Sequence, residues 1–74
     1  MSNVRLTPIK LERLRAGILQ VELSQRAGIR VARLSQLENA HYQPTASELE
    51  RIANVLGVPV AALVPNGETM QGAA

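Results

Sequence analysis

The chain contains no cysteine, tryptophan or phenylalanine, and Tyr42 is its only aromatic residue. Aspartate is also missing. Without cysteine, neither a disulfide framework nor a thiolate metal site can form, and a reducing cytoplasm suits such a chain. Because bulky aromatic side chains are scarce, the core has to be built from Leu, Ile, Val and Ala. Alternating runs of Val, Thr and aromatic residues between turn signals, typical of strands, are missing too. These absences favour an all-α fold of packed helices.

Long hydrophobic runs are also missing. The first ten residues, MSNVRLTPIK, lack the apolar segment of a signal peptide. The longest apolar stretch is VLGVPVAALV at 55–64, which is interrupted by a glycine and a proline. A membrane-spanning helix needs about 20 consecutive apolar residues. We therefore expect no membrane partner and a cytoplasmic location.

A chain of 74 residues is long enough for one domain. Its formal net charge of +2 is unevenly distributed along the sequence. Residues 1–44 contain seven Lys or Arg and three Glu, which gives +4. Residues 45–74 contain one Arg and three Glu, which gives −2. The N-terminal part is therefore suited to a polyanion such as DNA.

Capping residues and apolar spacing predict a series of short helices. Thr7-Pro8 is typical of a helix start, and TASE at 45–48 is a capping box before an apolar stripe. The expected helices are 8–16, 20–28, 31–39, a fourth with its stripe from Ala46 to Leu56, and a short fifth from Pro59 to about Leu63. We expect an N-terminal arm at 1–6, one domain at 7–64 and a flexible tail at 65–74.

The second and third of these helices predict a helix-turn-helix at about 20–39. Gly28 stands where the chain turns, at a position where a Cβ would clash or where φ is positive. Ser24 is small enough to face the following helix closely. Such a pair of helices is a common way to place one helix in the major groove of DNA.

Residues 17–64, GILQVELSQRAGIRVARLSQLENAHYQPTASELERIANVLGVPVAALV, resemble the lambda-repressor-like, Cro/Xre-type DNA-binding domain. The matching positions follow the family order: Gln20, Ser24, Gly28, Leu34, Leu37-Glu38, Pro44 and Leu49–Val58. The resemblance extends over about residues 6–64 and implies an all-α fold of five helices, with the third helix in the major groove.

Three positions depart from the family pattern. Arg30 replaces the Ser or Thr that usually caps the recognition helix, so we expect that cap to be lost or shifted. Ala40 replaces the usual Gly, and we expect Asn39 to take the left-handed conformation instead. Ser24 is a mild variant of the usual Ala.

The resemblance, together with side-chain chemistry, predicts which residues read the bases. Arg33 can form two hydrogen bonds with guanine O6 and N7, and Gln36 can do so with adenine N6 and N7. Short apolar side chains can pack on thymine methyl groups. The expected base contacts are Val31, Ala32, Arg33 and Gln36; the simpler alternative is that Arg33 and Gln36 are merely solvated.

A second set is expected to contact the DNA backbone. Gln20 opens the second helix, where its amide and the helix N–H groups can hold a phosphate, although it can equally be an ordinary capping residue. Tyr42 can alternatively be a packed ring, and Ser35 can face a base instead. The full set is Gln20, Gln25, Arg26, Arg30, Ser35, Asn39, His41, Tyr42 and Gln43.

The resemblance also implies a structural ion pair between Arg13 and Glu38; a different alignment assigns that role to Arg15. Some relatives use an acidic patch on the second helix to contact RNA polymerase, and Glu22 lies there, although a solvated charge is the simpler interpretation. His41 is the only histidine, so no metal cluster is expected. No nucleophile pattern or Gly-rich phosphate loop predicts catalysis or a cofactor.

We therefore expect a sequence-specific DNA-binding regulator, a repressor or autoregulator, that binds a near-palindromic operator as a homodimer. The expected dimer surface is Val58, Val60, Leu63 and Val64, although Val58 and Leu63 can instead simply close the core. The alternative function is an antitoxin-type protein-interaction module that caps a partner protein and autoregulates its operon.

Overall fold

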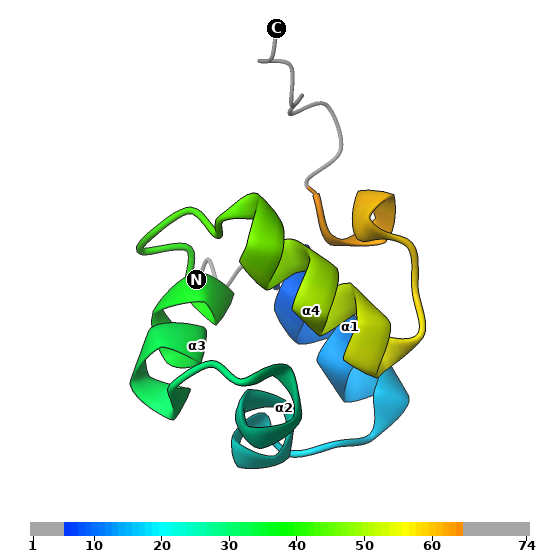
Figure 1. Cartoon of the computed structure of the whole chain (residues 1–74), viewed down its shortest axis with the longest axis horizontal. Helices are drawn as coiled ribbons and strands as arrows, with labels where there is room; N and C mark the ends of the chain where they lie inside the picture. Colours follow the sequence, from blue (N-terminus) through cyan, green and yellow to red (C-terminus); the bar gives the residue numbers. More distant parts are fainter. Residues whose placement is uncertain (1–5, 65–74) are drawn as a thin grey trace, which may run out of the picture.

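The computed structural model describes residues 6–64, and all regular elements within this range are helical. They are α1 (Pro8–Ala16), α2 (Gln20–Ala27), α3 (Val31–Glu38), α4 (Ala46–Leu56) and a 3₁₀ helix, η1 (Val60–Leu63), as Figure 1 shows. The all-α prediction is confirmed. The arm expected at 1–6, apart from Leu6, and the tail expected at 65–74 lie outside the described residues.

The fifth helix differs from the expected one in type. The amide of Ala62 donates to the carbonyl of Pro59 at 2.9 Å, and Val64 donates to Ala61 at 3.4 Å. These i→i+3 hydrogen bonds define a 3₁₀ helix, which suits a segment of four residues. Residues 6–64 therefore form four α-helices followed by one 3₁₀ turn.

The predicted caps of α1 and α4 are confirmed. The Thr7 Oγ1 accepts a hydrogen bond from the amide of Lys10 at 3.2 Å. At the start of α4, Thr45 Oγ1 accepts from the amide of Glu48 at 3.0 Å, and Glu48 Oε1 accepts from the amide of Thr45 at 2.9 Å. Arg30 makes no side-chain cap at the start of α3, in agreement with the expected loss of that cap.

The end of α3 corrects one expectation. Asn39 has a φ of −96°, whereas Ala40 adopts the left-handed conformation with a φ of 62°. The amide of Ala40 donates to the carbonyl of Leu37 at 3.2 Å, and that of His41 donates to Gln36 at 2.9 Å. These two hydrogen bonds form a Schellman ending, which requires positive φ at the residue after the cap whatever its side chain. The strain therefore falls on Ala40.

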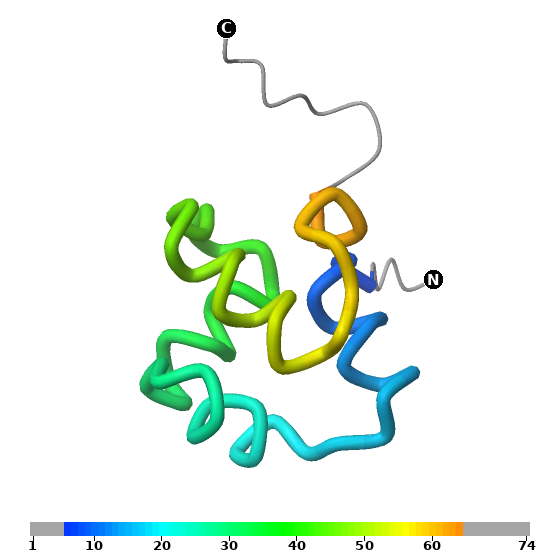
Figure 2. Tube along the Cα trace, turned by 45° about the vertical axis from the view of Figure 1, so that its right-hand side comes forward, coloured from blue at the N-terminus to red at the C-terminus, as the bar shows by residue number. Residues whose placement is uncertain are grey.

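One apolar core holds the helices together. α2 packs against α3 and α4, and α1 packs against α3, α4 and η1. Figure 2 shows η1 beside the first turn of α1, although the two are far apart in the sequence. Full burial of a Leu or Ile side chain contributes roughly 1.5–3 kcal/mol. The buried apolar residues are Ile9, Leu23, Ala27, Ile29, Leu34, Leu37, Ile52, Ala53 and Leu63.

Candidate nucleic-acid interface

The turn between α2 and α3 sets the direction of the second helix. Gly28 ends α2 with a φ of 70°, which a residue with a side chain adopts only with strain. A Cβ at this position would lie 3.4 Å from Arg51 Nη1, so the positive φ, more than a backbone clash, is the reason for glycine here. The amide of Ile29 then donates to Ser24 O at 3.0 Å and leads the chain into α3.

Helix α3 has one buried face and one exposed face. Leu34, Leu37 and Glu38 are buried against the rest of the fold. Three of the four expected base-contact residues, Val31, Ala32 and Gln36, are exposed. Within residues 6–64, the side chain of Gln36 forms no hydrogen bond, so its amide group is available to a ligand.

Arg33, the fourth expected base-contact residue, is held by other parts of the protein. Its Nε donates to Glu48 Oε2 at 2.9 Å, and its Nη2 donates to Glu48 Oε1 at 2.9 Å. Nη2 also donates to Gln43 O at 3.3 Å, and the guanidinium carbon lies 5.9 Å from the centre of the Tyr42 ring. The Arg33 side chain is only 31% exposed. It therefore joins α3 to α4 and to the loop between them.

This ion pair shifts the ionisation of both partners. The hydrogen bonds from Arg33 lower the pKa of Glu48 to about 2, with a further contribution from the Thr45 amide. Hydrogen bonding to Glu48 raises the pKa of Arg33. Both side chains are therefore charged at neutral pH, and the pair persists there.

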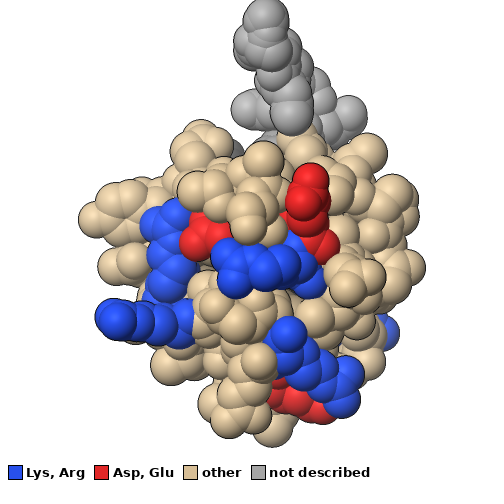
Figure 3. Space-filling model, in the orientation of Figure 1, with Lys and Arg blue, Asp and Glu red and all other residues tan. Residues whose placement is uncertain are grey.

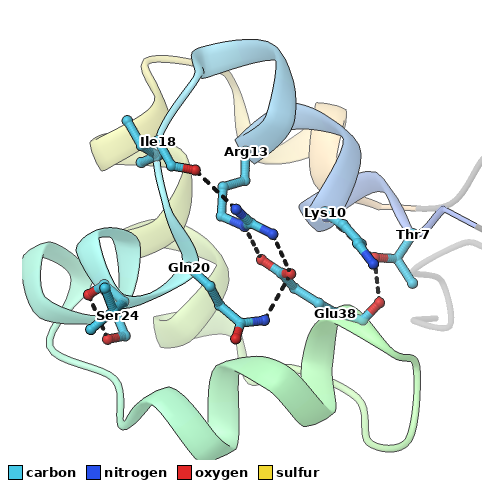
Figure 4. Close-up of polar contacts among 8 residues, drawn as sticks. Thr7, Lys10, Arg13, Ile18, Gln20, Ser24 and Glu38 are labelled. Carbon is cyan, nitrogen blue, oxygen red and sulfur yellow. Dashed lines mark hydrogen bonds and ion pairs between the residues drawn. The ribbon is translucent and has the colours of Figure 1, made fainter.

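A second ion pair lies deeper, between α1 and the end of α3 (Figure 4). Arg13 Nε donates to Glu38 Oε2 at 2.7 Å, and Arg13 Nη2 donates to Glu38 Oε1 at 3.1 Å. The Arg13 Nη1 donates to the carbonyl of Ile18 at 2.9 Å. The two side chains are 10% and 1% exposed. Arg13 is thus the partner of Glu38, whereas Arg15 lies at the surface beside Glu12 at 3.3 Å.

Gln20 belongs to the same buried network. Its Nε2 donates to Glu38 Oε1 at 3.0 Å, and its side chain points toward Glu38 in Figure 4. One amide N–H is therefore engaged, and the second remains available to a phosphate. No side chain caps the first turn of α2, because Leu19 occupies the capping position. The backbone N–H groups of that turn are therefore also open to an anion.

The remaining backbone-contact candidates surround α3, and most of them are exposed. Arg26 pairs with Glu22 at 2.8 Å on the surface of α2, so the Glu22 carboxylate is already engaged. Arg30 is exposed and has no carboxylate partner among the described residues. Ser35 is half-buried, and the exposed candidates are Gln25, Asn39, His41, Tyr42 and Gln43. The structure therefore leaves arginine side chains before α3 and uncharged polar groups or His41 in the loop after it.

The charged surface alternates in sign. Figure 3 shows several separate groups of Lys and Arg side chains on one face, some directly beside carboxylates. Four ion pairs join described residues, and the three outside the core each place an arginine beside a carboxylate. Within residues 6–64 the cations without a carboxylate partner are Lys10, Arg30 and Arg51. Among these, Arg30 directly precedes α3.

The residues expected at a dimer surface differ in exposure. Leu63 is 2% exposed and is part of the core, so it does not offer a surface to a second copy. Val58 packs partly against the core, as the alternative interpretation expected, and Val64 is half-buried. Val60 is 37% exposed. Burial of Leu63 corrects its assignment to the dimer surface.

Sequence reasoning missed two side chains of α4 that contact the helix-turn-helix. Glu48 was expected only as part of the capping box, and its ion pair with Arg33 was not predicted. Arg51 Nη1 donates to Ala27 O and Gly28 O, each at 3.1 Å, and so binds the C-terminal carbonyls of α2. The available signal was a charged side chain on a helix that must pack against the helix-turn-helix. Sequence alone does not show which partner such a charge meets.

Two other features are missing from the described part of the chain. No helix within it is long and apolar enough to pass through a membrane. The described residues also contain no group of three or more His, Cys, Asp or Glu side chains placed to bind a metal ion.

Comparison with known proteins agrees with this geometry. A family profile described as "Helix-turn-helix" matches residues 9–63, which is most of the chain. The chain is also 36% identical over 60 residues to a protein named "Immunity repressor protein" from Bacillus phage phi105. That alignment covers 81% of this chain but only 40% of the phage protein.

Proposed function

The chain belongs to the helix-turn-helix family of the Cro/C1 (Xre) type, a family of DNA-binding and not catalytic domains, and we propose that it is a sequence-specific transcriptional regulator. In this proposal α3 lies in the major groove and the first turn of α2 lies against the DNA backbone. The observation that carries the proposal is the exposed face of α3, which presents Val31, Ala32 and Gln36 to solvent.

Base reading requires side chains that are exposed and whose polar groups are free. The Gln36 amide can donate to and accept from an adenine edge, and Val31 and Ala32 can contact thymine methyl groups. Arg33 can reach a guanine only with its remaining N–H groups or by giving up part of its contact with Glu48. Gln36 is therefore the main polar reader in this proposal.

Phosphate contacts set the position of α3 in the groove. Arg30 is free of carboxylate partners within residues 6–64, and the open N–H groups at the start of α2 attract an anion. The exposed loop residues Asn39, His41, Tyr42 and Gln43 provide polar groups on the other side. Phosphate contacts made by arginines such as Arg30 release counterions, so the affinity for any DNA falls as the salt concentration rises.

We further propose that the protein acts as a repressor or autoregulator and binds as a homodimer. The name of the phage relative supports repression, although that relative is longer than this chain. One copy offers few base contacts, whereas specific sites must compete with a large excess of random DNA. A dimer doubles the contacts on a near-palindromic operator. Val60 is the exposed apolar member of the expected dimer surface and is the residue to test.

The experiment that tests the DNA-binding proposal is a selection from a random DNA library, followed by titration of the recovered sites at two salt concentrations. Recovery of a near-palindromic site that binds far more tightly than random DNA supports the proposal. Binding without sequence preference that vanishes at modest salt would refute it and would favour the alternative of a protein-interaction module.

Two glutamine variants sharpen this experiment. Gln36→Ala is expected to weaken operator binding by about 1–3 kcal/mol and to relax preference at one base pair in each half-site. Gln25→Ala, a matched change on α2, is expected to weaken all sequences to a similar extent because it removes a backbone contact. Equal behaviour of the two variants would contradict the assignment of Gln36.

Dimerisation is tested separately by sedimentation of the wild type and of Val60→Glu, with and without operator DNA. The wild type is expected to be a dimer on DNA, and Val60→Glu is expected to shift it toward the monomer because it places a charge in the interface. A wild type that remains monomeric on its operator would rule out the dimer.

A further inference from the structure

Arg33 lies at the edge of the recognition helix and not at the centre of its exposed face. Successive residues of an α-helix turn by about 100°. On that spacing Ala32 and Gln36 lie within about 40° of each other, whereas Arg33 lies about 40° from the buried Leu37. The Arg33 side chain consequently starts on the flank of α3 that faces α4.

Several N–H groups of Arg33 are engaged within the protein, so the guanidinium cannot form two parallel hydrogen bonds with one base. A guanidinium makes two parallel hydrogen bonds through one of two edges, Nε with Nη2 or Nη1 with Nη2. Glu48 takes the first edge through both Nε and Nη2. The carbonyl of Gln43 takes the second N–H of Nη2. Both edges therefore contain an engaged group, and among described residues only Nη1 is without a partner.

We propose that Arg33 is a positioning residue and that Arg33 and Glu48 together hold the loop at 39–45 in the shape that contacts the DNA backbone. Bases are then read by the exposed face of α3 without Arg33. The proposal rests on the DNA-binding function proposed above, and it assigns to Glu48 a part in DNA binding although Glu48 itself touches no DNA.

The contacts of Arg33 extend along the loop and into the next helix. Gln43 receives a hydrogen bond through its carbonyl, Tyr42 lies with its ring 5.9 Å from the guanidinium carbon, and Glu48 anchors the other end in the first turn of α4. Glu48 Oε1 also accepts from the Thr45 amide, so the residue that follows the loop is tied to the same carboxylate. One guanidinium thereby fixes both the middle and the end of the loop.

This arrangement explains why arginine stands at position 33. Lysine would retain the positive charge but has no planar fork, so it cannot bind a carboxylate through two edge groups and a carbonyl at the same time. The proposal therefore predicts that Arg33→Lys behaves more like Arg33→Ala than like the wild type. A residue that supplied only charge would be replaced by lysine with little loss.

The first test needs no DNA. Backbone ¹⁵N relaxation is measured for Ala40–Gln43 in the wild type, Arg33→Lys, Glu48→Gln and Glu50→Gln. Glu50→Gln is the matched control, since Glu50 is an exposed carboxylate on the same helix with no ion pair in the described range. Order parameters in the loop are expected to fall in Arg33→Lys and Glu48→Gln, toward the values of flexible backbone below about 0.6, and to stay unchanged in Glu50→Gln. Loop order that is unchanged in Glu48→Gln would overturn the proposal.

The second test uses the selected operator and random DNA. Relative to Glu50→Gln, which removes the same charge, Glu48→Gln is expected to bind both DNAs roughly 2- to 30-fold more weakly, the range for coupling through a packed network. The slope of log affinity against log salt is expected to equal that of Glu50→Gln, because the loop at 39–45 contains no Lys or Arg and its contacts neutralise no phosphate. Base preference is expected to remain that of the wild type in both Glu48→Gln and Arg33→Ala.

A direct contact between Arg33 and a base would give different binding results. If Glu48 merely competes with guanine for Arg33, Glu48→Gln binds the operator more tightly than Glu50→Gln, and Arg33→Ala loses preference at one base pair. Either result would overturn the positioning role. If the wild type shows no sequence preference at all, the proposed function fails, and the relaxation measurements alone then decide whether the loop is held by this pair.

Discussion

Replacing Arg13 with Met is expected to destabilise the fold far more than replacing any exposed arginine. The Arg13 side chain is 10% exposed, and its removal leaves the Glu38 carboxylate, 1% exposed, without its charged partner. Loss of one member of a buried ion pair costs about 3–5 kcal/mol, because the remaining charge is no longer compensated. A chain of this length is stable by only roughly 4–11 kcal/mol. Arg13→Met therefore removes a large share of the total stability.

The assay is urea and thermal unfolding followed by circular dichroism at pH 7. For a domain of this size, 1 kcal/mol corresponds to about 4–8 °C in Tm, so the expected decrease exceeds about 12 °C. Arg15→Met is the control. It removes an exposed contact of 3.3 Å with Glu12 and is expected to change the free energy of unfolding by less than about 1 kcal/mol.

A double variant separates the effect of charge from the effect of packing. Arg13→Met with Glu38→Leu removes both charges and is expected to be more stable than Arg13→Met alone, because no buried carboxylate is left unpaired. Gln20 is only half-buried, so water can replace the hydrogen bond that its amide gives to Glu38. A double variant whose loss of stability equals the sum of the two single losses, or an Arg13→Met no less stable than Arg15→Met, would refute this reasoning.

Three other changes have defined outcomes. Ala40→Gly is expected to stabilise the fold by about 1 kcal/mol in urea unfolding, because Ala40 has a φ of 62°. Asn39→Gly is the control and is not expected to stabilise the fold, because Asn39 has a φ of −96°. No gain in stability from Ala40→Gly would contradict the left-handed conformation of Ala40. Glu48→Gln is expected to lower the free energy of unfolding at pH 7 by up to about 3 kcal/mol, since Arg33 lowers the pKa of Glu48 from 4.5 to about 2. The stability that Glu48 gains from being ionised is complete above about pH 5 and is lost as the pH falls toward 2. The free energies of unfolding of the wild type and of Glu48→Gln should therefore converge over that range. If the difference between these two free energies did not depend on pH, the ion pair would be excluded as its source. Leu63→Ala is expected to cost about 2–5 kcal/mol in the same urea assay, since Leu63 is buried, and a loss below about 1 kcal/mol would place it at the surface instead.

Local interactions explain why the helices could be predicted from the sequence. The Thr7 and Thr45 caps and the ends at glycine depend on residues only a few positions apart, so the sequence pattern specifies them directly. The error at Ala40 is of the same local kind. The Schellman hydrogen bonds place the left-handed conformation at a fixed position after the helix, and an alanine there accepts the strain.

The candidate DNA-binding surface was predictable only in part. The spacing along α3 placed Ala32 and Gln36 away from the apolar face, and both side chains are exposed. The same spacing grouped Val31 with the buried Leu34 and Leu37, and only the family resemblance indicated the exposed position that Val31 has. The resemblance also indicated the Arg13–Glu38 pair, but the sequence left Arg15 as an alternative. Contact between α1 and α3 decided it, since Arg13 lies on the buried side of α1 and Arg15 on the exposed side.

The sequence by itself determined the helical class, the caps at Thr7 and Thr45 and the outward side of Ala32 and Gln36 on α3, because short-range hydrogen bonds and a 3.6-residue period produce them. Only the tertiary structure decided the partners of the long charged side chains. Arg33 meets Glu48 15 positions away, and Arg51 reaches the carbonyls of Ala27 and Gly28. A flexible side chain pairs with whichever group the packing of the helices brings within a few ångströms, and that proximity is a property of the assembled core.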